Sequence, residues 1–120
     1  MKKLIKSFKY AFEGIFTGIK EEQNIKIHIA IMILVIIFGI ILKISKIEWI
    51  ICIALFGLVI SMEMINTAIE NTVDLITKEK NEQAKIAKDV AAGAVLVSAI
   101  ASAIIGLMIF LPRILAIFLK

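Results

Sequence analysis

The chain has 120 residues, of which 61% are hydrophobic, and a mean hydropathy of +1.00. This is too apolar for a soluble domain of ordinary composition, and the length suits one domain, residues 1–120. The net charge of +4 comes with no basic, aromatic-interleaved soluble surface, so no nucleic-acid partner is expected. One cysteine and one histidine exclude an intrachain disulfide and a Cys/His zinc site.

Apolar side chains recur at helical spacing near the N-terminus: Leu4, Ile5, Phe8, Phe12, Ile15, Phe16 and Ile19. Lysines and one glutamate mostly occupy the other face. The pattern predicts an amphipathic helix over about 2–20 that lies in the membrane surface. Packing of this helix on the protein's own bundle is the alternative, and both can hold at once. Lysines interrupt the apolar core that a signal peptide requires.

Three segments are apolar enough to cross a bilayer, at about 25–42, 49–76 and 88–111. The stretch Val90 to Leu111 carries no charge and is long enough to cross alone. The first segment is short and needs its flanking isoleucines. No β pattern competes, so the sequence predicts an all-α integral membrane bundle.

The connections between these segments are polar. A polar elbow at 20–24 precedes the first span, a tight turn at 43–46 follows it, and a charged loop at 77–88 precedes the third. Pro112 is expected to kink or end the third span.

The cations are unevenly distributed. Residues 1–28 carry six lysines and residues 77–89 carry four, whereas the turn after the first span has two, and the tail has Arg113 and Lys120. The positive-inside rule places the N-terminus and the 77–89 segment in the cytoplasm, and three spans then place the C-terminus outside.

Small residues recur in the last span at helical spacing: Ser98, Ala99, Ser102, Ala103 and Gly106. Small faces let helices approach closely in lipid, so tight packing is expected there, either within the chain or between subunits. Cys52 stands among isoleucines and leucines and is interpreted as a packing residue.

Polar side chains interrupt the second span in a regular way, at Glu63, Asn66, Thr67, Glu70 and Asp74. On a helix these positions fall within roughly 100° of one another. A single polar residue in a membrane helix often serves only helix packing, and this interpretation is sufficient for Thr67 considered alone. Three carboxylates would repel one another without a cation, and Mg²⁺, which takes oxygen ligands, is the natural counter-charge.

A second polar cluster is expected at the cytoplasmic surface, with Glu22 and Asn24 from the elbow and Lys88 and Asp89 opening the third span. Asp74 lies near that face, and Glu63 roughly 15 Å deeper. This arrangement suits a reaction between a water-soluble donor and a lipid. Phosphate-binding glycine loops are missing, so the residues alone leave an ion- or proton-coupled membrane protein nearly as well supported as an enzyme.

The run Glu63–Asp74, EMINTAIENTVD, resembles the signature of the prokaryotic diacylglycerol kinase family, Glu-x-x-Asn-Ser/Thr-Ala-Ile/Leu-Glu-x-x-x-Asp. Lys88-Asp89 followed by AAGAVL at 91–96 resembles its second block, and the similarity covers nearly the whole chain. The resemblance implies a lipid kinase of the bacterial cytoplasmic (inner) membrane that uses MgATP and assembles as a homotrimer with shared active sites.

By position, the resemblance assigns Glu63 as the general base and Glu22 and Glu70 as metal ligands. It assigns the following residues to the nucleotide or to organising the site: Lys3, Lys6, Tyr10, Asn66, Asp74, Glu79, Lys80, Asn81, Lys88 and Asp89. Lys3 stands where enteric-type members have arginine.

The segment Glu22–His28, EQNIKIH, resembles the undecaprenol kinase branch of the family through Asn24 and His28, which the diacylglycerol-specific branch lacks. The resemblance therefore favours phosphorylation of undecaprenol to undecaprenyl phosphate. The alternative is a diacylglycerol kinase that makes phosphatidic acid.

Overall fold

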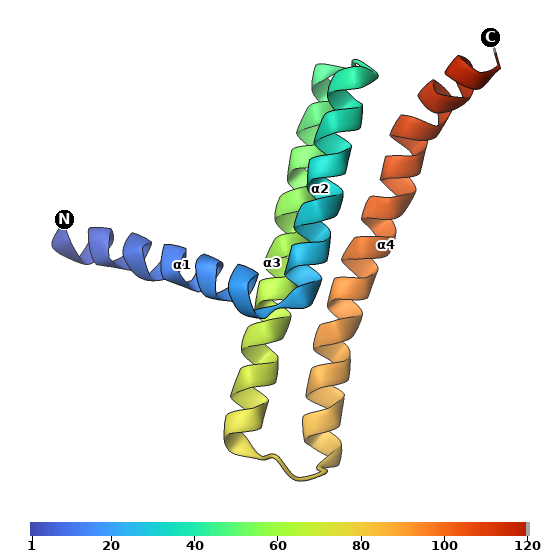
Figure 1. The fold of residues 1–120 in the computed structure, drawn as a ribbon. Coiled ribbons are helices and arrows are strands. Elements are labelled where there is room, and N and C mark those ends of the chain that lie inside the picture. The colour runs from blue at the N-terminus through green and yellow to red at the C-terminus, as the bar shows by residue number, and fades with distance from the viewer. Residues whose placement is uncertain (120) are drawn as a thin grey trace.

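The computed structural model describes residues 1–119, and this part of the chain forms four α-helices. They are α1 (Lys2–Glu21), α2 (Gln23–Ile41), α3 (Lys46–Ile76) and α4 (Glu82–Phe118). Figure 1 shows α2 and α3 as an antiparallel pair, α4 returning alongside α3, and α1 leaving the bundle at a steep angle. The last three are long and apolar enough to cross a membrane, which confirms the expected all-helical membrane fold with three spans.

The helix that contains the third span is longer at both ends than the expected span. The charged loop expected over 77–88 is confined to 77–81, and the helix continues past Pro112 to Phe118. Asn81 starts α4 early because its side-chain oxygen accepts a hydrogen bond from the Ala84 amide at 3.1 Å. The helix does not end at Pro112, and where the membrane span ends within α4 stays a prediction. Lys120, counted in the tail charge, lies outside the described residues.

The turn between α2 and α3 is tight, as expected. Ser45 and Glu48 form a reciprocal capping box, with the Glu48 amide donating to the Ser45 hydroxyl at 3.2 Å and the Ser45 amide donating to the Glu48 carboxylate at 2.9 Å. Glu48 also pairs with Arg113 near the end of α4. A side chain at Gly39 would collide with Trp49, because a Cβ built there lies 2.6 Å from the indole ring. These contacts join all three spans at this end of the bundle.

A small apolar core lies at the same end, built on Ile44, Cys52 and Ile109. The buried free thiol confirms the prediction that Cys52 packs in the interior. Most other large apolar side chains of the helices remain exposed on the single chain, as expected of surfaces that meet lipid tails or other subunits rather than water.

The small-residue face of α4 is buried within the chain at Ser98 but has no close neighbour at Gly106. Ser98 and Ser102 donate to carbonyls of their own helix, Val95 at 2.7 Å and Ser98 at 2.8 Å. A Cβ built on Gly106 would meet nothing within 4 Å. Close approach of another helix to Gly106 is therefore not made within the chain, and packing between subunits stays a prediction.

Candidate functional site

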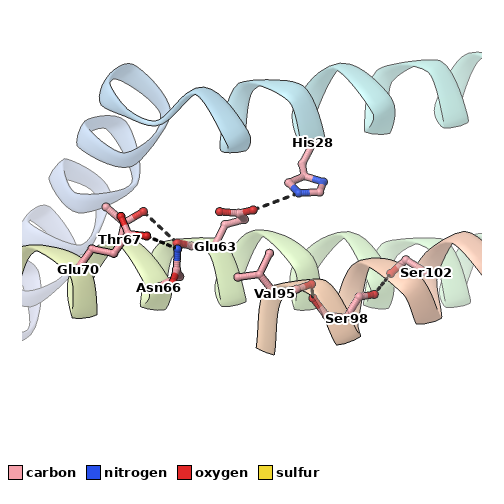
Figure 2. A network of polar contacts seen from close by, with 8 residues as sticks. All are labelled: His28, Glu63, Asn66, Thr67, Glu70, Val95, Ser98 and Ser102. Carbon is pink, nitrogen blue, oxygen red and sulfur yellow. Dashed lines mark hydrogen bonds and ion pairs between the residues drawn. The ribbon is translucent and has the colours of Figure 1, made fainter. Parts of the chain in front are cut away.

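The polar stripe of α3 changes from buried to exposed along the helix. The side chains of Glu63 and Asn66 are 3% and 8% exposed, Glu70 is half-buried, and Asp74 is exposed. Figure 2 shows the first three following one another along α3, with Glu63 directed toward His28 on α2 and Asn66 bonded to Glu70. The stripe thus connects a buried carboxylate to a water-accessible one, as the sequence predicts.

His28 on α2 reaches across to this stripe. Its Nε2 lies 3.2 Å from Oε1 of Glu63 (Figure 2). Removing a carboxylate from water is costly unless it gains a partner, and the imidazole is that partner. The sequence identifies His28 only through a resemblance to one branch of the family, so its contact with the candidate base is a finding of the structure.

One turn further along α3, the amide of Asn66 donates through Nδ2 to Oε1 of Glu70 at 3.0 Å. The other amide atom, Oδ1, is buried and has no hydrogen-bond partner among the described residues. A buried acceptor without a partner is rare in native proteins. Thr67 instead bonds the Glu63 carbonyl at 3.0 Å, which agrees with a packing role for the threonine.

A charged pocket of about 610 Å³ lies where α3 ends and α4 begins. At its edge the Lys88 ammonium donates to the Asp74 carboxylate at 2.6 Å, and Lys85 pairs with Asp89 at 2.6 Å. The structure brings together six of the residues expected to organise the nucleotide: Asp74, Glu79, Lys80, Asn81, Lys88 and Asp89. Mixed lysines and carboxylates around an open pocket suit a metal-bound polyphosphate.

The remaining predicted residues lie near the junction of α1 and α2. Glu22 forms the junction, is half-buried, and donates its backbone amide to the Gly18 carbonyl at 3.0 Å. A Cβ on Gly18 would lie 3.8 Å from Met64, so the junction packs against α3 beside Glu63. Asn24 is exposed in the first turn of α2.

The N-terminal half of α1 extends away from the stripe (Figure 1). Lys3, Lys6 and Tyr10 lie on this part and are exposed. The structure of one chain does not bring them to the other predicted site residues. Their place near the nucleotide stays a prediction that depends on neighbouring subunits.

An apolar cavity of about 270 Å³ lies between α2, α3 and α4 on the other side of Glu63 from the charged pocket. His28 is one of its lining residues, and the small residues Ala99, Ser102, Ala103 and Gly106 of α4 form one wall. The small residues of the last span are the sequence signal for this cavity, although such a pattern predicts close helix packing as well.

Among residues 1–119, no three histidine, cysteine or acidic side chains are grouped so that they could hold a metal ion by themselves. Mg²⁺ in phosphoryl-transfer sites is bound through one or two carboxylates together with substrate phosphates. Glu70 and the unpartnered Oδ1 of Asn66 are oxygen ligands of this kind on adjacent turns of α3, and a contribution of Glu22 from the α1–α2 junction stays a prediction. This donor set therefore fits Mg²⁺ that arrives with a nucleotide.

Comparison with known proteins identifies relatives along nearly the full chain. Residues 9–110 match the family model for prokaryotic diacylglycerol kinase. An undecaprenol kinase of Bacillus subtilis is 48% identical over 94% of this chain and 92% of its own. A diacylglycerol kinase of Synechocystis is 38% identical over 95% of this chain and 66% of its own length. A diacylglycerol kinase of Haemophilus influenzae is 32% identical over 79% of this chain and 80% of its own length.

Proposed function

The chain belongs to the prokaryotic diacylglycerol kinase family and is a membrane lipid kinase, and we propose that it transfers the γ-phosphate of ATP to undecaprenol. Family membership decides between the two classes that the residues alone left open, in favour of the enzyme over an ion-coupled membrane protein. The choice of lipid rests on the 48% identical undecaprenol kinase and on Asn24 and His28.

One observation supports the mechanism above all others. The buried carboxylate of Glu63, held by His28, separates an apolar cavity from the start of a polar stripe that ends in a charged pocket. A lipid hydroxyl reaches Glu63 from the apolar side and a nucleotide from the charged side. Phosphoryl transfer depends mainly on positioning and charge neutralisation, so this meeting point is where the reaction is expected.

In the proposed reaction Glu63 accepts the proton of the lipid hydroxyl. The lipid oxygen forms a bond to the γ-phosphorus, the bond from that phosphorus to the β–γ bridging oxygen breaks, and ADP leaves. Lys88 neutralises phosphate charge, and Asp74 fixes the lysine through their 2.6 Å ion pair. Mg²⁺, held by Glu22 and Glu70 with the Asn66 carbonyl oxygen nearby, would neutralise charge on the phosphate oxygens.

The depth of Glu63 follows if α1 lies in the cytoplasmic membrane surface, as we propose from its lysine-rich and apolar faces. The last turn of α1 approaches α3 at Met64, since a Cβ built on Gly18 would lie 3.8 Å from the Met64 side chain. From Lys46 to Met64 the helix rises about 27 Å, close to the hydrocarbon thickness of about 30 Å. Glu63 is then at the boundary between lipid and water, which is shallower than the depth expected from the sequence, and Glu70 and Asp74 face the cytoplasm, where ATP is available.

A homotrimer is proposed for the active assembly. The helices of one chain leave large apolar faces exposed, and Asp74 at the end of the stripe is exposed as well. Neighbouring copies would cover these faces and would bring Lys3, Lys6 and Tyr10 of one copy to the nucleotide of another.

The test is ATP-dependent phosphorylation by purified protein, with undecaprenol and diacylglycerol assayed side by side. Undecaprenol is expected to be the better substrate by kcat/KM. Glu63→Gln keeps the size of the side chain but removes the base, so turnover should fall by about 10²–10⁴-fold while nucleotide binding persists. Preference for diacylglycerol, which the relatives at 38% and 32% identity favour, would overturn the choice of lipid. Near-normal turnover of Glu63→Gln would remove Glu63 from the mechanism.

A further inference from the structure

The apolar cavity is built differently from the rest of the bundle interior. Its lining comes from all three spans and is almost entirely aliphatic or aromatic, and its polar members are His28 at one end and Ser102, whose hydroxyl is already bonded to a backbone carbonyl. A cavity with this lining excludes water and favours a hydrocarbon occupant.

The polar end of the cavity is the candidate catalytic end. His28 both lines the cavity and contacts Glu63 at 3.2 Å. From Glu63 the cavity follows α3 past Val59 to Cys52, and eleven residues of helix correspond to about 16 Å. All of it lies on the side of Glu63 opposite the charged pocket, which is the membrane side if ATP binds in that pocket.

The α4 wall makes the cavity wide. Ala99, Ala103 and Gly106 face large side chains on α2 and α3, and the position of a Gly106 side chain is open space. The methyl branch on every isoprene unit of a polyprenyl chain would occupy the open space beside Gly106, whereas diacylglycerol would have to place two acyl chains in about 270 Å³.

We infer that this cavity holds the isoprene units of the lipid alcohol next to its hydroxyl, with the hydroxyl at Glu63 and the rest of the chain in the bilayer. The inference rests on the proposed function and makes it more specific. His28 lies at the point where the polar and apolar parts of the substrate meet. The α4 wall determines which lipid tails fit, so the cavity is a specificity site distinct from the residues that transfer the phosphate.

Cys52 gives a test that does not depend on kinase activity. It is the only cysteine, is buried, and lines the cavity. In trimeric or monomeric detergent-solubilised protein, a small uncharged maleimide should alkylate Cys52, and undecaprenol should slow the reaction about tenfold at about ten times its dissociation constant, by mass action. Diacylglycerol at equal concentration should protect much less. Glu63→Gln should be protected like the unmodified chain, because tail binding does not need the base.

Two outcomes of this experiment would overturn the inference. Equal protection by both lipids would make the cavity a general site for membrane lipid chains. An alkylation rate of Cys52 that undecaprenol does not change would mean that the lipid does not enter the cavity, as when a helix of a second copy fills the space. Protection by undecaprenol without phosphorylation of undecaprenol would instead uphold the binding site and reject the proposed function.

A substitution at Gly106 tests the wall itself. Gly106→Leu places a side chain in the open space and should raise the KM for undecaprenol about tenfold or more, since apolar pockets discriminate single methylene groups by about 10-fold to 200-fold. The KM for ATP should not change. Gly57→Leu is the matched control, because Gly57 is also in a span and also has open space around it but does not line the cavity. Equal effects of the two substitutions on the lipid KM would contradict the inference, and the Cys52 experiment decides if Gly106→Leu does not fold.

Discussion

His28 and Glu63, 35 positions apart in the chain, meet at 3.2 Å between the imidazole Nε2 and the carboxylate Oε1. This contact joins α2 to the polar stripe of α3 at its most buried carboxylate. Hydrogen bonds that hold a catalytic carboxylate contribute by fixing its orientation toward the reacting group. His28 is therefore a positioning residue for the proposed base.

Replacement of His28 by Leu should lower kcat by about 10- to 100-fold, because a lost hydrogen bond to a charged group is worth about 1.5–3 kcal/mol. His28→Gln keeps an N–H donor and should recover part of the loss. The KM for ATP should stay the same in both variants, since the imidazole is on the lipid side of Glu63. Steady-state kinetics on undecaprenol measures this, and a wild-type kcat in His28→Leu would show that the contact does not matter for catalysis.

Glu22 and Glu70 are predicted to act on one Mg²⁺. Each single change to Gln should weaken the apparent Mg²⁺ affinity measured by titrating activity at fixed ATP. The double variant should lose less Mg²⁺-binding free energy than the sum of the losses in the two single variants, because residues of one site act as a unit. Glu13→Gln, an exposed acid on α1 that lines neither the charged pocket nor the apolar cavity, controls for the loss of surface charge. Strictly additive losses would assign Glu22 and Glu70 to separate sites.

Much of the site was predictable because its members are close in sequence. Helical periodicity places Glu63, Asn66 and Glu70 on one face, and the structure confirms that shared face. The contact between His28 and Glu63 was not predictable from periodicity, since it depends on how α2 and α3 are aligned along each other. That alignment is determined by the turn between them and by the contact of Gly39 with Trp49, and no pattern within one helix encodes it.

Hydropathy alone was sufficient to predict that the fold contains three spans. The ends of α4 depend on local bonds instead. Asn81 caps the helix within what reads as a charged loop, and the helix continues past Pro112 to Phe118. The cavity was missed because small residues on a helix predict close packing equally well, and only the opposing side chains decide which occurs.

Gly39 is predicted to be necessary for the α2–α3 packing. Gly39→Ala places a methyl group 2.6 Å from the Trp49 ring, and such overpacking costs about 1–3 kcal/mol. Its thermal unfolding temperature in detergent should therefore fall. Gly57→Ala, in open space on α3, should leave the unfolding temperature unchanged or raise it, because alanine is favoured over glycine in a helix by about 1 kcal/mol. A stable Gly39→Ala protein would mean that the indole ring moves aside freely.

The orientation of the chain in the membrane is the last prediction, and the mechanism depends on it because ATP is cytoplasmic. Single cysteines at Lys46 and Lys78, in a Cys52→Ala background, report on the two ends of α3. Both lysines are exposed, and neither caps a helix, unlike Ser45 and Asn81. Both substitutions remove one positive charge, so each serves as the control for the other. In right-side-out vesicles a membrane-impermeant thiol reagent should label position 46 and spare position 78, and permeabilised vesicles should be labelled at both. Labelling of position 78 in intact vesicles would place the charged pocket outside the cell, where ATP is scarce, and would reject the proposed nucleotide site.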